Sequence, residues 1–170
     1  MATPRNEIVF VCTGNTCRSP MAEGLFRHAL AAQDEPLKTL AVSSAGVSTF
    51  ESQPAARNAV TALSKVGIDI ADHRSQPLSQ ELFDRALVFF AMTDTHLAML
   101  SFQSDIHSVP AFLMRQFIGD GSTDQIPDPF GMSLEHYEES RDSMVEAIPS
   151  LLQVVKQLME ERSHNAANDA

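Results

Sequence analysis

The chain has 170 residues, a length that suits one domain with a hydrophobic core. Its 12 basic and 22 acidic side chains give a formal net charge of −10, which argues against nucleic acid and anionic membranes as partners. Residues 1–7 contain no apolar signal segment, and the longest apolar run, residues 86–92, is too short to span a bilayer. We therefore expect a cytoplasmic protein.

The first predicted elements are a strand, a loop and a helix. Residues 8–11 (Ile-Val-Phe-Val) form a β-branched and aromatic run that is typical of a buried strand. Gly14 and Asn15 tolerate the left-handed backbone that a tight loop requires. Ser19 suits the N-cap, and Pro20 the first position, of a helix that continues to about residue 32.

The loop of residues 12–18 has the features of an anion-binding site. Backbone N–H groups from Thr13 to Arg18 can converge on one concavity, to which the helix N-terminus adds its positive end. Arg18 supplies a planar fork that matches two phosphate oxygens. Cys12 lies at the floor of this concavity, where a helix N-terminus and a cation favour the reactive thiolate. The pattern predicts transfer of a phosphoryl group to sulfur.

The middle of the chain predicts alternating strands and helices. Residues 86–92 are continuously apolar, as expected for a central parallel strand. Within the second helix, Val60, Leu63 and Val66 share one face. The predicted elements are, in order, a strand over residues 37–44 that ends at Ala45–Gly46, a helix over 55–66 that stops at Gly67, a short helix capped by Ser79 that ends at 85, a strand over 86–92, a helix from Thr93 or Asp94 to about 102, a strand over 106–109 and a helix over 110–118.

The last predicted element is an amphipathic packing helix that starts near residue 133. Pro149 should kink it or begin a second segment. Residues 163–170 are polar and predict a frayed tail.

This order of elements predicts an α/β fold, namely a single-domain parallel four-stranded sheet with helices on both faces and a phosphate-binding loop after strand 1. We expect one domain over residues 1–162, because no internal repeat or linker divides the chain. Ligands of such sheets bind beyond the carboxyl ends of the strands, and the Cys12 loop occupies that position.

The predicted chemistry also needs a proton donor for the leaving group and a base for the attacking water. Asp128 is the best candidate, because Pro127 and Pro129 stiffen the backbone around it. The two cysteines, Cys12 and Cys17, suggest neither a disulfide framework nor a metal set, so we predict no metal and no cofactor. We expect most of the six histidines to be exposed.

The spacing Cys12-x5-Arg18-Ser19 resembles the signature of cysteine-dependent phosphatases, and the wording CTGNTCRSPMAE resembles the low-molecular-weight protein-tyrosine-phosphatase family. The resemblance covers nearly the whole chain and implies that Asp128-Pro129-Phe130 carries the general acid. It also implies that Ser19 donates a hydrogen bond to the thiolate and that Asn15, Ser44 and His73 form a hydrogen-bonded support. The predicted phosphate-binding and supporting residues are Thr13, Gly14, Asn15, Thr16, Cys17, Ser19, Ser44 and His73.

The substrate side chain is less strongly specified. The family's tyrosine branch usually has a bulky aliphatic residue before the second cysteine of the loop, whereas this chain has Thr16 and resembles the protein-arginine-phosphatase branch. The Thr16 hydroxyl could form a hydrogen bond close to the scissile P–N group of such a substrate. Thr16 and Phe130 are the predicted walls of the substrate cleft. The predicted partner is a phosphorylated protein substrate, with phosphoarginine favoured and phosphotyrosine the alternative. We expect the protein itself to be a monomer or a weak dimer.

Other classes stay open. A small-molecule phosphatase fits the same residues. Arsenate reductases that share this loop need a further cysteine, and residues 78–100 contain none. A phosphate-binding module without catalysis would not need both Cys12 and Asp128.

Overall fold

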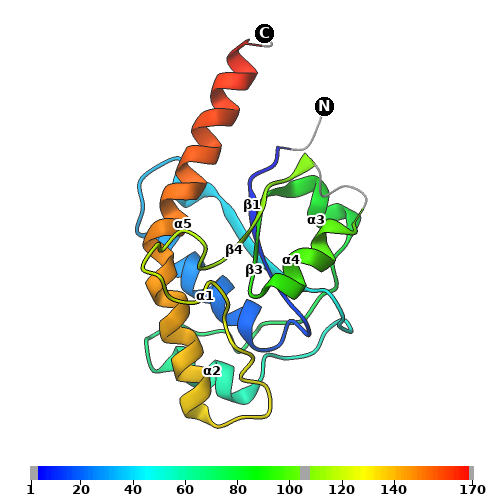
Figure 1. The fold of residues 1–170 in the computed structure, drawn as a ribbon, viewed down its shortest axis with the longest axis vertical. Helices are drawn as coiled ribbons and strands as arrows, with labels where there is room; N and C mark the ends of the chain where they lie inside the picture. Colours follow the sequence, from blue (N-terminus) through cyan, green and yellow to red (C-terminus); the bar gives the residue numbers. More distant parts are fainter. Residues whose placement is uncertain (1–3, 104–107, 169–170) are drawn as a thin grey trace.

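The structure is a computed structural model that describes residues 4–103 and 108–168. Its centre is a four-stranded parallel sheet with the strand order β2-β1-β3-β4 (Figure 1). The strands are β1 (Glu7–Cys12), β2 (Ala41–Gly46), β3 (Ala86–Ala91) and β4 (Ala111–Leu113). The helices are α1 (Arg18–Ala31), η1 (Leu37–Thr39), α2 (Arg57–Ser64), α3 (Gln80–Arg85), α4 (Asp94–Ser101) and α5 (Leu134–Asn168). The predicted fold class is confirmed.

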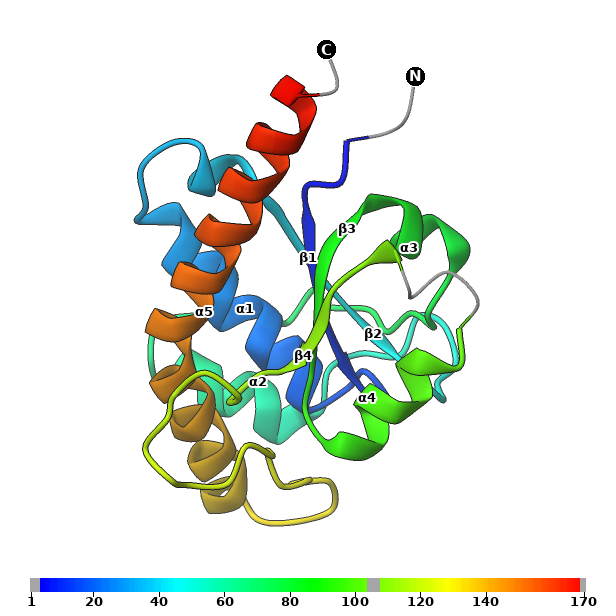
Figure 2. The same cartoon turned by 45° about the horizontal axis from the view of Figure 1, so that its top comes forward.

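Helices cover both faces of this sheet, with α1, α2 and α5 on one side and α3 and α4 on the other (Figure 2). Alternate residues of β1 serve the two layers, because successive side chains of a strand point to opposite faces. Ile8 and Phe10 pack into the core beneath α1 and α5. Val9 and Val11 pack into a second core with residues of α3 and α4. A strand buried on both faces must be apolar throughout, which explains the run that marks β1 in the sequence.

The loop after β1 leaves the sheet at its carboxyl edge, between β2 and the start of α1. Cys12, the last residue of β1, is in register with Gly46, the last residue of β2. A Cβ atom on Gly46 would lie 2.6 Å from the Thr13 carbonyl oxygen, so only glycine allows the loop to cross this strand end. The sheet therefore fixes the position of the loop through a close backbone approach.

Several predicted boundaries differ from the structure. Helix α1 begins at Arg18, so Ser19 is not its N-cap; the Ser19 side chain instead turns inward to Cys12 and Asn15. Residues 37–39 form the 3₁₀ turn η1 before β2 rather than strand. Helix α2 is shorter than predicted, and Val66, which was expected on its inner face, is 46% exposed. The stop at Gly67 is confirmed by its φ of 80°.

The fourth strand also lies elsewhere. Residues 106 and 107 of the expected strand fall outside the described residues, and β4 is formed by Ala111–Leu113, where a helix was predicted. The reason is tertiary, because the Pro110 carbonyl accepts a bond from the Phe89 N–H and the Met114 N–H donates to the Ala91 carbonyl. Pairing with β3 thus overrides the local helix pattern, and the backbone continues into turns after Leu113.

Helix α5 runs without interruption through Pro149, so no second segment begins there. Proline has no N–H to donate a hydrogen bond to the carbonyl four residues earlier, which here is the carbonyl of Val145. Because Val145 is half-exposed, water can hydrate this carbonyl in place of the lost bond. The helix continues to Asn168, so the expected frayed tail is wrong for residues 163–168, although these residues are exposed. In residues 4–103 and 108–168, no helix is both long and apolar enough to cross a membrane.

Candidate active site

The loop between β1 and α1 surrounds the Cys12 sulfur with hydrogen-bond donors. Cys12 is 3% exposed, and its Sγ lies 2.8 Å from the Ser19 hydroxyl oxygen. The Asn15 backbone N–H donates to the same sulfur across 3.3 Å. The Ser19 hydroxyl and the Asn15 N–H thus both lie within hydrogen-bond distance of this sulfur. The geometry therefore suits a nucleophile at the floor of the loop.

Asp128 reaches this loop from a part of the sequence far from β1. Its Oδ2 lies 3.3 Å from the Arg18 guanidinium, which also donates to the Ile126 carbonyl across 3.1 Å. Arg18 is 5% exposed, whereas the Asp128 side chain is 53% exposed, so the acid lies at the solvent side of the pair. The Phe130 N–H donates to Asp128 Oδ1 and fixes the turn. The structure thus brings together all three predicted catalytic side chains.

A cleft of about 350 Å³ opens above the sulfur. Thr16 and Phe130, the two predicted walls, both line it, and so does Phe50, a side chain that is 80% exposed. Phe50 and its neighbours were missed because sequence analysis made no prediction for residues 47–53. An aromatic residue in a polar loop was the available signal. The lining residues are Cys12, Thr13, Gly14, Thr16, Cys17, Arg18, Ser48, Thr49, Phe50, Gln53, Asp128 and Phe130.

Asn15 connects the loop to its supports. Its φ is 54°, the left-handed conformation that the sequence predicted. Its side-chain amide donates to the hydroxyls of Ser19 and Ser44, across 2.8 and 2.9 Å, and its side-chain oxygen accepts from the Gln76 N–H. The His73 Nε2 lies 2.8 Å from the Asn15 carbonyl oxygen. The contacts expected among Asn15, Ser44 and His73 are therefore present.

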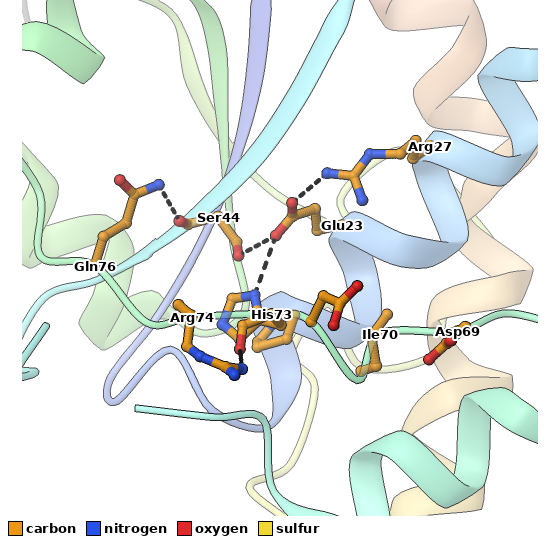
Figure 3. Close-up of a pocket in the computed structure, with 10 residues that line it drawn as sticks. Glu23, Arg27, Ser44, Asp69, Ile70, His73, Arg74 and Gln76 are labelled. Carbon is orange, nitrogen blue, oxygen red and sulfur yellow. Dashed lines mark hydrogen bonds and ion pairs between the residues drawn. The ribbon is translucent and has the colours of Figure 1, made fainter. Parts of the chain in front are cut away.

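Glu23 is a second residue that sequence reasoning missed. Its Oε2 accepts a 2.5 Å bond from the Ser44 hydroxyl and lies 3.7 Å from the His73 Nδ1 (Figure 3). Burial raises the pKa of Glu23, but the hydrogen bonds from His73 and Ser44 and the charge of Arg27 outweigh it and hold the pKa below its ordinary value. The signal was its place one turn after Ser19 on the same helix face. Glu23 lines a separate cavity of about 340 Å³ that shares no lining residue with the cleft above Cys12.

Cys17 lies in the same loop as Cys12 and is also a buried, free cysteine. Its Sγ lies 3.3 Å from the Tyr137 hydroxyl. Burial raises the pKa of the Cys17 thiol, while the bond with Tyr137 acts in the opposite direction. Burial likewise raises the pKa of Tyr137. Cys17 is thus held as a neutral thiol near the cleft.

His96 differs from the exposed histidines that the sequence suggested, since it is 3% exposed. It lies in the first turn of α4, with Nε2 2.8 Å from the Thr13 hydroxyl and Nδ1 3.0 Å from the Thr93 hydroxyl. Burial, and then the charge of Arg18, lower its pKa to about 4. His96 is therefore neutral at physiological pH. Among the residues that the structure describes, no group of three or more His, Cys, Asp or Glu side chains could hold a metal ion.

A thiol, a buried guanidinium and an acid around one cleft define a cysteine-dependent phosphatase. The model of the family "Low molecular weight phosphotyrosine protein phosphatase" matches residues 7–164. The chain belongs to this family of protein phosphatases, which hydrolyse phosphorylated protein side chains.

Relatives with two specificities match the chain. The protein-arginine-phosphatase of Bacillus subtilis is 39% identical over 156 residues, which are 92% of this chain and 99% of the relative. The low-molecular-weight protein-tyrosine-phosphatase PtpB of Staphylococcus epidermidis is 28% identical, over 85% of this chain and 96% of the relative. Among solved structures, the YwlE arginine phosphatase of Geobacillus stearothermophilus matches with a TM-score of 0.77 at 36% identity, over 91% of this chain and 96% of that chain.

The buried neutral state of His96 predicts a pH-dependent stability. The unfolded chain takes up this proton near pH 6.5 and the folded chain only near pH 4, so between these values the unfolded state binds more protons. The free energy of unfolding should therefore decrease as the pH falls through this window. Between about pH 7 and about pH 5, wild type should lose about 1–2 kcal/mol more than His96→Gln in urea denaturation. Equal losses would contradict the neutral state; His28→Gln, at an exposed position, is the matched control.

The two cysteines predict reversible oxidation. We expect peroxide to oxidise Cys12 to a sulfenic acid. The Cys17 sulfur then attacks the sulfenic sulfur, the S–O bond breaks, and water leaves as the Cys12–Cys17 disulfide forms. We expect thiol reductants to restore activity fully in wild type, and mass spectrometry to find the bridge. Cys17→Ser should lose activity irreversibly under the same treatment. Irreversible loss in wild type, no worse in Cys17→Ser, would contradict this protection.

Proposed function

We propose that the protein removes phosphate from phosphoarginine side chains of proteins, through a phosphocysteine intermediate on Cys12. The observation that carries the proposal is the cleft in which Cys12, Arg18 and Asp128 meet beneath a wall that contains Thr16. The protein-arginine-phosphatases of Bacillus subtilis and Geobacillus stearothermophilus are 39% and 38% identical to the chain, whereas PtpB is 28% identical. This difference supports phosphoarginine as the substrate side chain.

In the first step, the Cys12 sulfur attacks phosphorus and the bond to the leaving group breaks. Arg18 binds two phosphoryl oxygens, and because it is buried it does so in a low dielectric where the attraction is strong. The Ser19 hydroxyl stabilises the sulfur before attack and again as it leaves. A structure of a YwlE arginine phosphatase mutant, 37% identical to this chain, holds a phosphorylated active-site serine, which supports a covalent intermediate here.

Asp128 acts in both steps. It gives a proton to the leaving group and then takes one from the water that attacks phosphorus, so the P–S bond breaks and phosphate is released. Its exposed position lets water reach it, while Phe130 and Arg18 hold its two oxygens. Before substrate binds, Asp128 is paired with Arg18 at a position that partly overlaps the place of the incoming phosphate. Binding of the phosphate therefore weakens this ion pair and releases the Asp128 carboxyl group for proton transfer.

The phosphotyrosine alternative also has an observation in its favour. Phe50 and Phe130 are 80% and 72% exposed at the cleft, where they could pack against a phenyl ring. The same faces can stack on a guanidinium plane, so they do not decide between the two substrates. The hydroxyl-bearing residues Thr16 and Ser48 also line the cleft, and such residues favour a polar guanidinium.

Two variants test the catalytic roles. Cys12→Ser should abolish turnover of p-nitrophenyl phosphate yet still bind vanadate, because the loop is retained while the nucleophile is lost. Arg18→Lys should lower kcat/KM by at least about a hundredfold, since a point charge cannot replace the bidentate fork. Substantial hydrolysis by Cys12→Ser would contradict the mechanism, and near-normal activity of Arg18→Lys would remove Arg18 from its role. Circular dichroism of each variant controls for folding.

Thr16→Ile tests the substrate side chain. The change removes one hydroxyl and adds apolar bulk, which is worth about 1–3 kcal/mol, or roughly tenfold to a hundredfold in the ratio of kcat/KM for phosphoarginine to that for phosphotyrosine peptides. We expect this ratio to fall in Thr16→Ile and to stay unchanged in Thr39→Ile, the same change at an exposed threonine outside the cleft. A wild-type preference for phosphotyrosine, or a ratio unmoved by Thr16→Ile, would favour an ordinary tyrosine phosphatase.

A further inference from the structure

A side-chain hydrogen bond between Thr13 and His96 joins the loop after β1 to α4. Thr13 directly follows Cys12, is an exposed residue and lines the cleft. Behind it lies the buried ring of His96, which does not line the cleft. Thr93, His96 and Thr13 form a row in which each contact is 2.8 or 3.0 Å long. The row therefore leads from the protein interior to the reaction site.

The N-cap of α4 favours one direction for these hydrogen bonds, which depends on the tautomer of His96. The Thr93 hydroxyl oxygen accepts from the His96 backbone N–H, as an N-cap residue does. The hydroxyl hydrogen of Thr93 is then available for the His96 Nδ1 across 3.0 Å. A neutral ring that accepts at Nδ1 carries its hydrogen on Nε2, so Nε2 donates to the Thr13 oxygen across 2.8 Å.

This direction leaves the Thr13 hydroxyl with one defined role. Its oxygen accepts from His96, so its own hydrogen is free to point into the cleft. A phosphoryl group above Cys12 presents only acceptor oxygens, and these gain negative charge as the transition state forms. An oriented hydroxyl donor at this place would stabilise them without reorganisation during the reaction.

We propose that His96 is a positioning residue that turns the Thr13 hydroxyl into a hydrogen-bond donor toward the phosphoryl oxygens. The proposal rests on the proposed phosphatase function but not on the choice between arginine and tyrosine, because both substrates carry the same phosphoryl group. In this proposal, Thr93 sets the tautomer of the His96 ring, the ring N–H orients the Thr13 hydroxyl, and that hydroxyl contacts the substrate. The donor adds to the contacts of Arg18 and of the backbone N–H groups.

The test is a double-mutant cycle read on two substrates and one transition-state analogue. Thr13→Val removes the hydroxyl and keeps the shape of the side chain, whereas Thr13→Ser keeps the hydroxyl. His96→Leu removes the donor, and His96→Gln restores an amide N–H near the place of Nε2. We measure kcat and KM with p-nitrophenyl phosphate and a phosphoarginine peptide, and the affinity for vanadate.

Thr13→Val and His96→Leu should each lower kcat and vanadate affinity by about tenfold, with little change in KM, on both substrates alike. The double variant should be no worse than either single variant, since both remove the same donor. Thr13→Ser and His96→Gln should recover most of the loss. Multiplicative losses in the double variant, wild-type kcat in Thr13→Val, or failure of His96→Gln to recover would overturn the proposal.

The two failures are distinguishable. If His96→Leu does not fold, Thr13→Val compared with Thr13→Ser and His96→Gln compared with wild type still decide the outcome. If wild type itself hydrolyses neither substrate, the proposed function fails, whereas an active wild type with an unaffected Thr13→Val overturns only the role of His96.

Discussion

The hydrogen bonds of Asn15 are the constraint on which the site depends. A non-glycine residue at a φ of 54° is strained, by about 1 kcal/mol, and it stays there only because its surroundings hold it. The side-chain amide of the fully buried Asn15 donates to Ser19 and Ser44, and its oxygen accepts from Gln76. These partners come from α1, from β2 and from the segment before α3, so the loop takes its shape only when the sheet is assembled.

Charge around the loop is arranged by the same contacts. Glu23 contacts Ser44 and His73, which support the Cys12 loop, whereas Asp128 pairs with Arg18 at the cleft. One carboxylate thus lies on the supported side of the loop and one on the cleft side. Glu23 is mostly buried and fixed by three neighbours, whereas Asp128 is half exposed and has one ionic partner. A fixed buried charge suits support, and an exposed one suits proton exchange with water. The difference in burial thus suits Glu23 to support and Asp128 to the proton transfers of the proposed mechanism.

The sequence predicted local features directly, whereas it predicted long-range contacts only where Asp128 and the family resemblance implied them. Cys12, Arg18 and Ser19 belong to one continuous turn, so their spacing alone placed them together. β1 and β3, buried on both faces, were equally clear because their apolar runs are continuous. By contrast, β4 was misread because it is stabilised by tertiary contacts, namely pairing with β3 and packing against α4. Phe50, Glu23 and His96 were missed because their hydrogen-bond partners lie 21 to 83 residues away. Contacts of that kind follow from topology, which no local pattern encodes.

The same division explains where specificity must arise. In the proposed mechanism, Arg18 and the loop bind the phosphoryl group that phosphoarginine and phosphotyrosine share, so the continuous motif would not discriminate between them. The walls of the cleft come instead from three separate segments, namely Thr16, the loop with Phe50 and the turn with Phe130. Two of these walls are exposed aromatics that accept either substrate, and Thr16 is held by its own backbone, whose carbonyl accepts from the Ala56 N–H. Because its backbone is held in this way, Thr16 is the wall whose side chain we expect to weigh most on the choice of leaving group.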